Sequence, residues 1–234
     1  MNRAKKKTII SLCAVFALAV AIESNGYDIF DRPDGANWAC DIDPQCHRLS
    51  AEDTQLVQRF LGHKIDTSRI RIFNRDFLGL LGRPMAPNGH IYLDESWYDP
   101  ADKEKQMKRK TFLLHEAIHV WQDQQGRNLW LEAIGEWFRN GFNYNSSYRY
   151  SLNINQRFEF LGLEQQGKIV EDYARLRMEL DELTRSATNQ ISLKCNEILP
   201  IVKIISSTFP AVVPAICNDQ TPQFTPRETL RFGS

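Results

Sequence analysis

Residues 110–122 have the sequence KTFLLHEAIHVWQ, which contains the pattern H-E-x-x-H at His115, Glu116 and His119. Two histidines four positions apart on a helix are separated by about 400° of rotation, so both imidazoles leave the same helical face. Such a face can bind a zinc ion, and the glutamate after the first histidine can reach a water beside the metal without binding the metal itself. The stretch therefore predicts two metal ligands, His115 and His119, and a general base, Glu116.

The residues around this pattern favour a functional site over a chance match. Leu113, Leu114, Ile118 and Val120 are bulky and apolar, which indicates a buried helix. Buried polar groups need a partner or a metal. The alternative is that the two histidines are ordinary core residues and that Glu116 pairs with a lysine or an arginine.

The first 21 residues have the composition of a secretory signal peptide. Residues 1–7 are basic, residues 8–22 are largely apolar, and residues 19–21 provide a small-residue cleavage pattern. The apolar run is shorter than the roughly 20 residues of a membrane-spanning helix. We therefore expect cleavage near Ala21, export to the periplasm or beyond the cell, and no stable membrane span afterwards. An uncleaved N-terminal anchor is the alternative.

The composition of the expected mature chain limits its partners and predicts disulfides. Cleavage leaves 25 basic and 29 acidic residues, a formal charge of −4, which argues against a nucleic-acid partner. Four cysteines remain, and an even number in an exported chain predicts two disulfides. The sequence-local pairing is the simplest of three: Cys40 with Cys46, and Cys195 with Cys217. Zinc binding by cysteines is the rival, but no C-x-x-C pattern is present.

Sequence patterns divide the rest of the chain into an irregular leader (22–48), one domain (49–217) and a loose polar tail (218–234). Within the domain they predict a helix between Ser50 and Gly62, strands at 69–73 and 90–93, a helix from Pro100 to Gly126, a helix at 129–140, a tyrosine-rich loop at 142–150 and a helix at 156–184. The predicted fold class is α+β, mostly helical, with a small sheet beside the H-E-x-x-H helix.

A third metal ligand must come from outside the motif, because a catalytic zinc usually has three protein ligands and a water. The longer pattern H-E-x-x-H-x-x-G-x-x-H is absent, since Gln125 stands at its last position and no histidine follows His119. A downstream carboxylate is therefore expected. The candidates are Glu132, Glu136, Glu159, Glu164 and Glu171.

These carboxylates differ in their sequence surroundings. Glu164 lies among apolar residues and is expected to face inward, where a carboxylate needs a cation. Glu132 and Glu136 lie nearer the motif, as in thermolysin-type sites. Glu171 is a further candidate, or it orients an imidazole by accepting its N–H.

Two segments carry a resemblance to a known group of proteins. HEAIHVWQ at 115–122, followed about forty residues later by LEQQGKIVEDY at 163–173, resembles small bacterial gluzincin-type proteins that are Vgr-related or form the metallopeptidase-like core of contractile injection systems. The similarity covers about residues 50–173, and the chain has Gly167 where an alanine is usual. The resemblance implies a zincin-like fold, a bound Zn²⁺ and Glu164 as the third ligand, but no particular substrate.

These features predict a secreted zinc-dependent hydrolase, more specifically a metallopeptidase that acts on a peptide or protein. Zinc held by His115, His119 and Glu164 would lower the pKa of its water to about 7, and Glu116 would pass the proton to the leaving amine. A tyrosine of the loop would stabilise the oxyanion, with Tyr148 as the candidate beside Tyr144 and Tyr150.

Other possibilities stay open at this point. Strand 91–93 could pair with an extended peptide substrate. A secreted binding or structural module on a zincin scaffold and a cell-wall amidase are the alternative functions. The oligomeric state is left open.

Overall fold

The computed structural model describes residues 40, 43–76, 84–87, 89–96, 98–141, 144–153, 155–186, 190–210, 213–217 and 231–232. The expected signal peptide lies outside these residues, as do most of the expected leader and tail. Within the described ranges, no helix is both long enough and apolar enough to cross a membrane.

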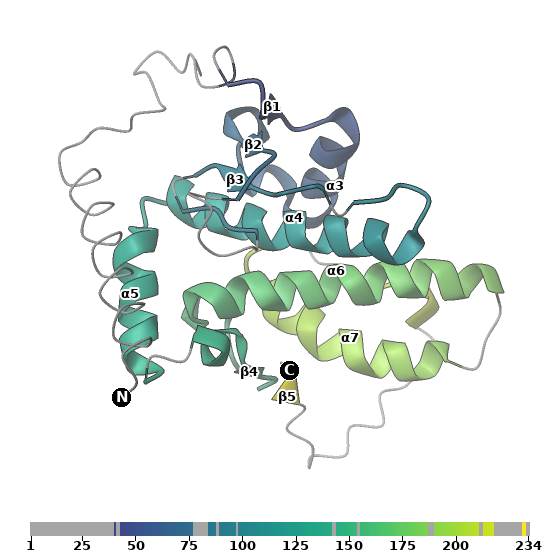
Figure 1. The fold of residues 1–234 in the computed structure, drawn as a ribbon. Coiled ribbons are helices and arrows are strands. Elements are labelled where there is room, and N and C mark those ends of the chain that lie inside the picture. Colours follow the sequence, from purple (N-terminus) through teal and green to yellow (C-terminus); the bar gives the residue numbers. More distant parts are fainter. Residues whose placement is uncertain are drawn as a thin grey trace, which may run out of the picture.

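The described part of the chain is mostly helical with a small sheet, which confirms the predicted α+β class at that level. Its helices are α3 (Ala51–Leu61), α4 (Lys103–Gln124), α5 (Leu129–Arg139), α6 (Leu163–Ser186) and α7 (Ile191–Ile205). Its strands are β1 (Cys46–Arg48), β2 (Arg71–Phe73), β3 (Ile91–Tyr92), β4 (Tyr150–Ser151) and β5 (Arg231–Phe232). The helix α4 lies between the sheet with α3 on one side and α6 on the other, and α7 packs beyond α6 (Figure 1).

The three-stranded sheet has the order β1-β2-β3, with β1 antiparallel and β3 parallel to β2. The strand β1 corrects one expectation, because residues 46–48 were assigned to an irregular leader. A three-residue strand has little signal of its own and depends on its partner for pairing. Strand 91–93 cannot pair with a peptide substrate through Tyr92, because both backbone groups of Tyr92 are already bonded to Met85. The backbone N–H of Met85 donates to the Tyr92 carbonyl (3.1 Å), and the Met85 carbonyl accepts from the Tyr92 N–H (2.9 Å).

The helix α4 begins later than the sequence indicated. Asp102 is its N-cap, with the side-chain oxygen accepting from the backbone N–H groups of Glu104 (3.0 Å) and Lys105 (3.2 Å). Asp99 instead holds a turn, since its carboxylate accepts from the N–H of Ala101 at 2.9 Å. The predicted end is close, because α4 stops at Gln124 and Gly126 has a φ of +78°.

The C-terminal part differs most from expectation. The helix α7 contains Pro200 and was not predicted, because an interior proline removes a hydrogen bond and disfavours a helix by about 3 kcal/mol. Burial of apolar side chains on α7 offsets that effect, including Ile198 and Ile201 at 0% exposure. The tail was expected to be loose, but residues 231–232 form β5 and pair with β4.

Both disulfides in the structure follow the sequence-local pairing. Cys40 is bonded to Cys46, next to β1, and Cys195 of α7 is bonded to Cys217. The second bond closes a separation of 22 residues and joins α7 to the segment after it. In a chain-entropy estimate such a closure stabilises the fold by about 3 kcal/mol.

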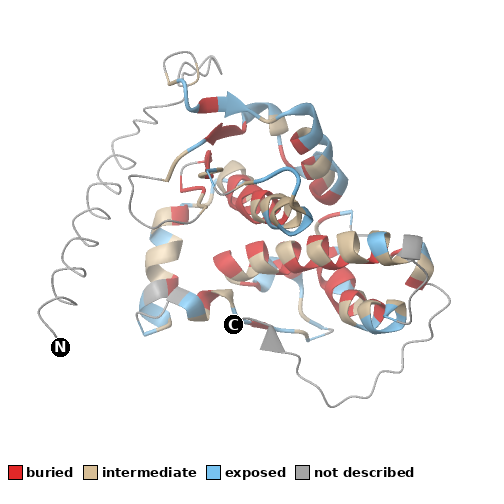
Figure 2. Ribbon diagram, turned by 45° about the vertical axis from the view of Figure 1, so that its right-hand side comes forward, coloured by how far each residue is buried: buried red, intermediate tan, exposed pale blue. Residues whose placement is uncertain are grey.

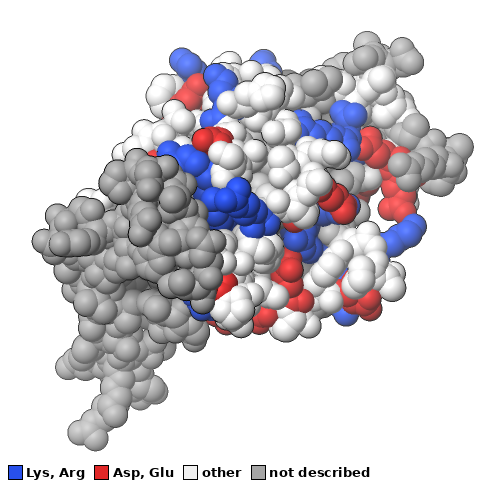
Figure 3. Space-filling view, turned by 90° about the horizontal axis from the view of Figure 1, so that it is seen from above, with Lys and Arg blue, Asp and Glu red and all other residues white. Residues whose placement is uncertain are grey.

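The core is continuous around α4 and α6. Leu113, Leu114 and Ile118 are all 0% exposed, and Figure 2 shows buried residues gathered where the helices face one another. On the face seen in Figure 3, basic and acidic side chains are interspersed rather than gathered by sign. The H-E-x-x-H residues therefore lie inside a packed helical core.

Candidate metal centre

Two antiparallel helices build the centre. His115 of α4 contacts Glu171 of α6, and Gln122, further along α4, contacts Leu163 at the start of α6. The two helices therefore run in opposite directions, and Figure 1 shows them side by side. Because the histidines are four residues apart on α4, both rings face α6. The structure thus brings together His115, His119 and Glu164, which sequence analysis had placed in one site.

The three side chains converge on one point. The Oε2 atom of Glu164 lies 3.2 Å from Nε2 of His115 and 3.4 Å from Nε2 of His119. One ligand atom from each residue lies within 4.8 Å of the others. Ligand atoms about 2.0–2.1 Å from a tetrahedral zinc are about 3.3–3.4 Å apart. The spacing of Glu164 from both rings therefore fits a shared metal ion.

The outer nitrogens of the two rings meet acceptors. His115 Nδ1 lies 3.1 Å from Oε2 of Glu171, and His119 Nδ1 lies 2.8 Å from Oε1 of Gln122. Each Nδ1 therefore carries a proton, and in a neutral ring this leaves the lone pair on Nε2. Two lone pairs and a carboxylate oxygen then face one another in a buried site, an arrangement that requires positive charge between them.

The pKa values show the same demand for positive charge. Burial lowers the pKa of His115, but its hydrogen bonds to Glu164 and Glu171 outweigh burial and raise the pKa to about 10. Burial likewise opposes the rise in the pKa of His119 that Glu164 produces. Burial raises the pKa of Glu164, yet the two imidazoles hold it well below its usual range. The cluster therefore attracts cations.

Glu116 lies between the two histidines on α4 and is 5% exposed. Its negative charge helps to raise the pKa of both His115 and His119, so it is close to both rings. Its position in the motif leaves it outside the three-residue ligand group. A carboxylate so placed is available to exchange a proton with a molecule at the centre.

The start of α6 determines where Glu164 points. The backbone N–H of Leu163 donates to Oε1 of Glu136, and the N–H of Gly162 donates to Oε1 of Gln165 at 2.9 Å. These contacts satisfy the first amides of the helix and keep α6 from starting at Gln156, the predicted start. Glu164 therefore lies in the first turn of α6 and faces α4.

The other carboxylates that were weighed as third ligands have different partners. Glu136 caps α6, Glu132 pairs with Arg127, and Glu159 is exposed and accepts from Thr208 at 3.2 Å. Glu171 contacts the Nδ1 side of His115 and is not part of the converging group. Its Oε1 atom binds Nζ of Lys168 at 3.0 Å. Among the described residues, Glu164 is the carboxylate that meets both histidines.

The tyrosines of the loop occupy different positions. The ring of Tyr148 lies 5.7 Å from the ring of His115, measured between centroids. Tyr150 is buried and donates to Oδ2 of Asp172 at 2.8 Å, so it does not face the centre as a helper would. The side chain of Tyr144 lies outside the described residues.

Gly167 explains how closely the helices approach. A Cβ atom at this position would lie 2.7 Å from Nε2 and 2.8 Å from Cε1 of His115. Ordinary carbon contacts are about 3.5–4.0 Å. Gly167, which stands where an alanine is usual, is therefore the position at which the His115 ring lies against the backbone of α6.

The sequence predicted Glu171 as a hydrogen-bond partner of an imidazole, but it did not predict Gln122, Gln166 and Arg127, which form the hydrogen bonds that lead away from His119. Gln122 and Gln166 are 0% and 1% exposed, and Arg127 follows the end of α4. The spacing of Gln122, three residues after His119 on the same helical face, was the available signal.

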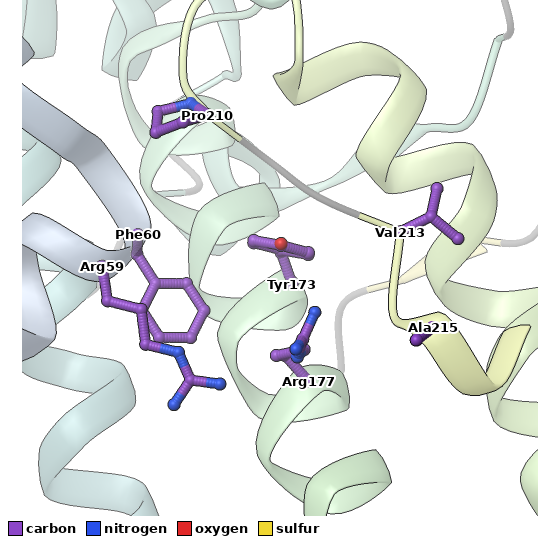
Figure 4. Close-up of a pocket in the computed structure, with 7 residues that line it drawn as sticks. All are labelled: Arg59, Phe60, Tyr173, Arg177, Pro210, Val213 and Ala215. Atoms are coloured by element: carbon purple, nitrogen blue, oxygen red, sulfur yellow. The ribbon is translucent and has the colours of Figure 1, made fainter.

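A separate groove lies between α3, α6 and the segment after α7 (Figure 4). Phe60 and Tyr173 meet there edge to face, with centroids 5.5 Å apart. The guanidinium groups of Arg59 and Arg177 both bind Asp181, at 2.7 and 3.3 Å, which offsets part of their positive charge. The lining residues are Arg59, Phe60, Tyr173, Arg177, Pro210, Val213 and Ala215.

Comparison with known proteins finds similarity both in sequence and in structure. The chain is 33% identical over 142 residues to the type VI secretion system spike protein VgrG2b of Pseudomonas aeruginosa, a match that covers 59% of this chain and 14% of that protein. It is also similar to the solved effector domain of VgrG2b, with 28% identity, a TM-score of 0.53, and coverage of 76% of this chain and 96% of that domain. No model of a protein family matches the chain.

These likenesses agree with the Vgr-related part of the expected resemblance. The match spans only 14% of the spike protein's length, whereas the structural likeness covers 96% of the solved effector domain. Neither likeness bears on zinc or on peptidase chemistry.

Proposed function

We propose that this chain is an exported zinc-dependent metallopeptidase with an effector role. The single observation that carries the proposal is the convergence of His115, His119 and Glu164 on one buried point, with Glu116 beside it. The likeness to the VgrG2b effector domain supports the effector role. The gluzincin resemblance of the sequence supports the choice of a peptidase.

In this proposal His115, His119 and Glu164 hold the ion, with two neutral nitrogens and one carboxylate as donors. When bound, zinc polarises a carbonyl group and makes a water molecule more acidic. Glu116 accepts the proton of the attacking water and returns it to the leaving amine, which requires one residue to act first as base and then as acid. Tyr148 is the candidate donor to the developing oxyanion, because its ring is next to that of His115.

Metal analysis of the purified protein tests the ligand set. We expect about one zinc per chain in the wild type and a loss of zinc in His119→Ala and Glu164→Ala. Glu104→Gln is the matched control, because Glu104 is an exposed glutamate on the same helix. Equal zinc content in Glu164→Ala and the control would contradict the assignment of Glu164.

Cleavage assays on a protein, a peptide library and purified peptidoglycan test the activity. Glu116→Gln should retain zinc and lose about 10²-fold or more in rate, as expected on removal of a general base. Cleavage confined to peptidoglycan would support the amidase alternative. A zinc-loaded wild type that cleaves none of these substrates would support the binding-module alternative.

A further inference from the structure

A chain of buried side-chain amides leads away from His119. Its Nδ1 donates to Oε1 of Gln122 at 2.8 Å, and Nε2 of Gln122 donates to Oε1 of Gln166 at 2.6 Å. Oε1 of Gln166 also accepts from Nη1 of Arg127 at 2.8 Å. The chain therefore connects the metal centre to a cation outside it.

The guanidinium group and the backbone carbonyls of Phe158 and Leu163 together fix the direction of every bond in this chain. Arginine can only donate hydrogen bonds, so Gln166 must turn its oxygen toward Arg127 and its nitrogen toward the carbonyl of Phe158, at 3.0 Å. Gln122 then turns its nitrogen toward Gln166 and toward the carbonyl of Leu163, at 3.1 Å. The oxygen of Gln122 consequently faces the ring of His119.

The local backbone places Arg127 where it can act. Gly126, with its positive φ, reverses the chain at the end of α4, and the N–H of Arg127 donates to the carbonyl of Gln122 at 3.1 Å. Arg127 also forms an ion pair with Glu132 of α5, through Nε and Nη2 and not through the Nη1 atom that binds Gln166.

We infer that Gln122, Gln166 and Arg127 are positioning residues that keep the proton of His119 on Nδ1 and its lone pair on Nε2, facing Glu164. The group that binds the ring of His119 is the neutral amide of Gln122, whereas the ring of His115 is bound by Glu171, which is paired with Lys168. The metal centre thus orients its two imidazoles by different means. This inference rests on the metal site of the proposed function but not on peptidase activity.

Loss of the directing cation should loosen the chain. In Arg127→Met, only the backbone carbonyls of Phe158 and Leu163 still orient the two amides, so the acceptor for Nδ1 of His119 is held less firmly. Disturbing such supporting hydrogen bonds typically weakens metal binding about 10- to 100-fold. Gln122→Leu should have a similar effect, and Gln122→Glu should rescue binding because it restores an acceptor.

The experiment measures zinc affinity of the full-length variants by competition with a chelator. Arg127→Met should bind zinc at least tenfold more weakly than wild type. Arg127→Lys, which keeps a donor, should lose less. Glu132→Gln is the matched control, because it removes the ion pair of Arg127 and leaves its hydrogen bond to Gln166 in place.

Nuclear magnetic resonance of the protein loaded with ¹¹³Cd gives a readout that structural damage alone would not produce. The wild type should show cadmium coupling to Nε2 of His119 and a slowly exchanging Nδ1–H signal. That proton signal should broaden or shift in Arg127→Met, while the corresponding signal of His115 stays unchanged.

The outcomes separate this inference from the proposed function. A folded Arg127→Met protein with zinc affinity within twofold of wild type would overturn the inference, as would an equal loss in Glu132→Gln. A wild type that binds zinc tightly but cleaves nothing would leave the role of Gln122, Gln166 and Arg127 unaffected and would contradict the peptidase proposal. A wild type that binds neither zinc nor cadmium would overturn both.

Discussion

Replacing Gly167 by alanine should weaken metal binding far more than it weakens the fold. The added Cβ would lie 2.7–2.9 Å from three atoms of the His115 ring. Restoring ordinary contact distances of about 3.5–4.0 Å requires the ring to move by roughly 0.6–1.3 Å. A displacement of that size spoils the distance between Nε2 and Glu164, so we expect zinc affinity to fall at least tenfold.

The effect of Gly167→Ala on stability should be smaller, because two contributions oppose each other. Overpacking destabilises by about 1–3 kcal/mol, while alanine is favoured over glycine in a helix by about 1 kcal/mol. The free energy of unfolding of the metal-free protein should therefore fall by about 0–2 kcal/mol in urea titrations. Chelator competition on the same samples gives the zinc affinity.

Gly135→Ala is the matched control for this substitution. Gly135 also lies within a helix, but a Cβ there would meet the movable guanidinium end of Arg139 at 3.3 Å instead of an imidazole. This variant should bind zinc like the wild type and be equally or more stable. If Gly167→Ala also retains wild-type affinity, the close packing of α6 against the His115 ring does not govern the site.

Three further predictions concern other parts of the molecule. Burial raises the pKa of Asp53, but its hydrogen bonds to Arg109 outweigh burial and lower that pKa. The ion pair of Asp53 with Arg109 therefore stabilises the fold fully above the unfolded pKa near 3.8, and this stabilisation disappears as the pH falls through the lower pKa of the folded state. Unfolding of Asp53→Asn should thus differ from wild type by about 1–3 kcal/mol at pH 7 and converge with it on acidification; a constant difference would contradict this. Tyr148→Phe should lower kcat by about 10- to 100-fold with unchanged zinc content, and an unaltered kcat would remove Tyr148 from the mechanism. Replacing Cys195 and Cys217 by alanine should reduce the free energy of unfolding by about 3 kcal/mol without altering zinc affinity, measured by urea titration and chelator competition.

The features that sequence predicted best are those set by neighbours in the chain. The face shared by His115 and His119 follows from helical periodicity alone, and Ser50 caps α3 as its sequence indicated. The arrival of Glu164 is different, because it depends on α5 and a loop returning the chain antiparallel to α4. Its apolar neighbours indicated burial but left the destination open.

The features that sequence missed depend on tertiary contacts. The helix α7 includes Pro200, so local propensity opposed a helix that packing against α6 supports. The strands β1 and β5 have three and two residues, too few for an alternating pattern to show. The amide chain from Gln122 was missed because a glutamine gives no pattern until its partners on another helix are known.

The site and the main helix interface of the fold are the same structure, and this links metal binding to stability. The contacts between α4 and α6 include His115, His119 and Glu164, so an ion held by these three side chains joins the two helices. A cation that binds only the folded chain stabilises it by about 2.7 kcal/mol at a concentration 100 times the dissociation constant. Zinc should therefore raise the unfolding temperature of the wild type and leave that of Glu164→Ala nearly unchanged. The same comparison with Glu104→Gln, which keeps the interface intact, separates this coupling from a general effect of added salt.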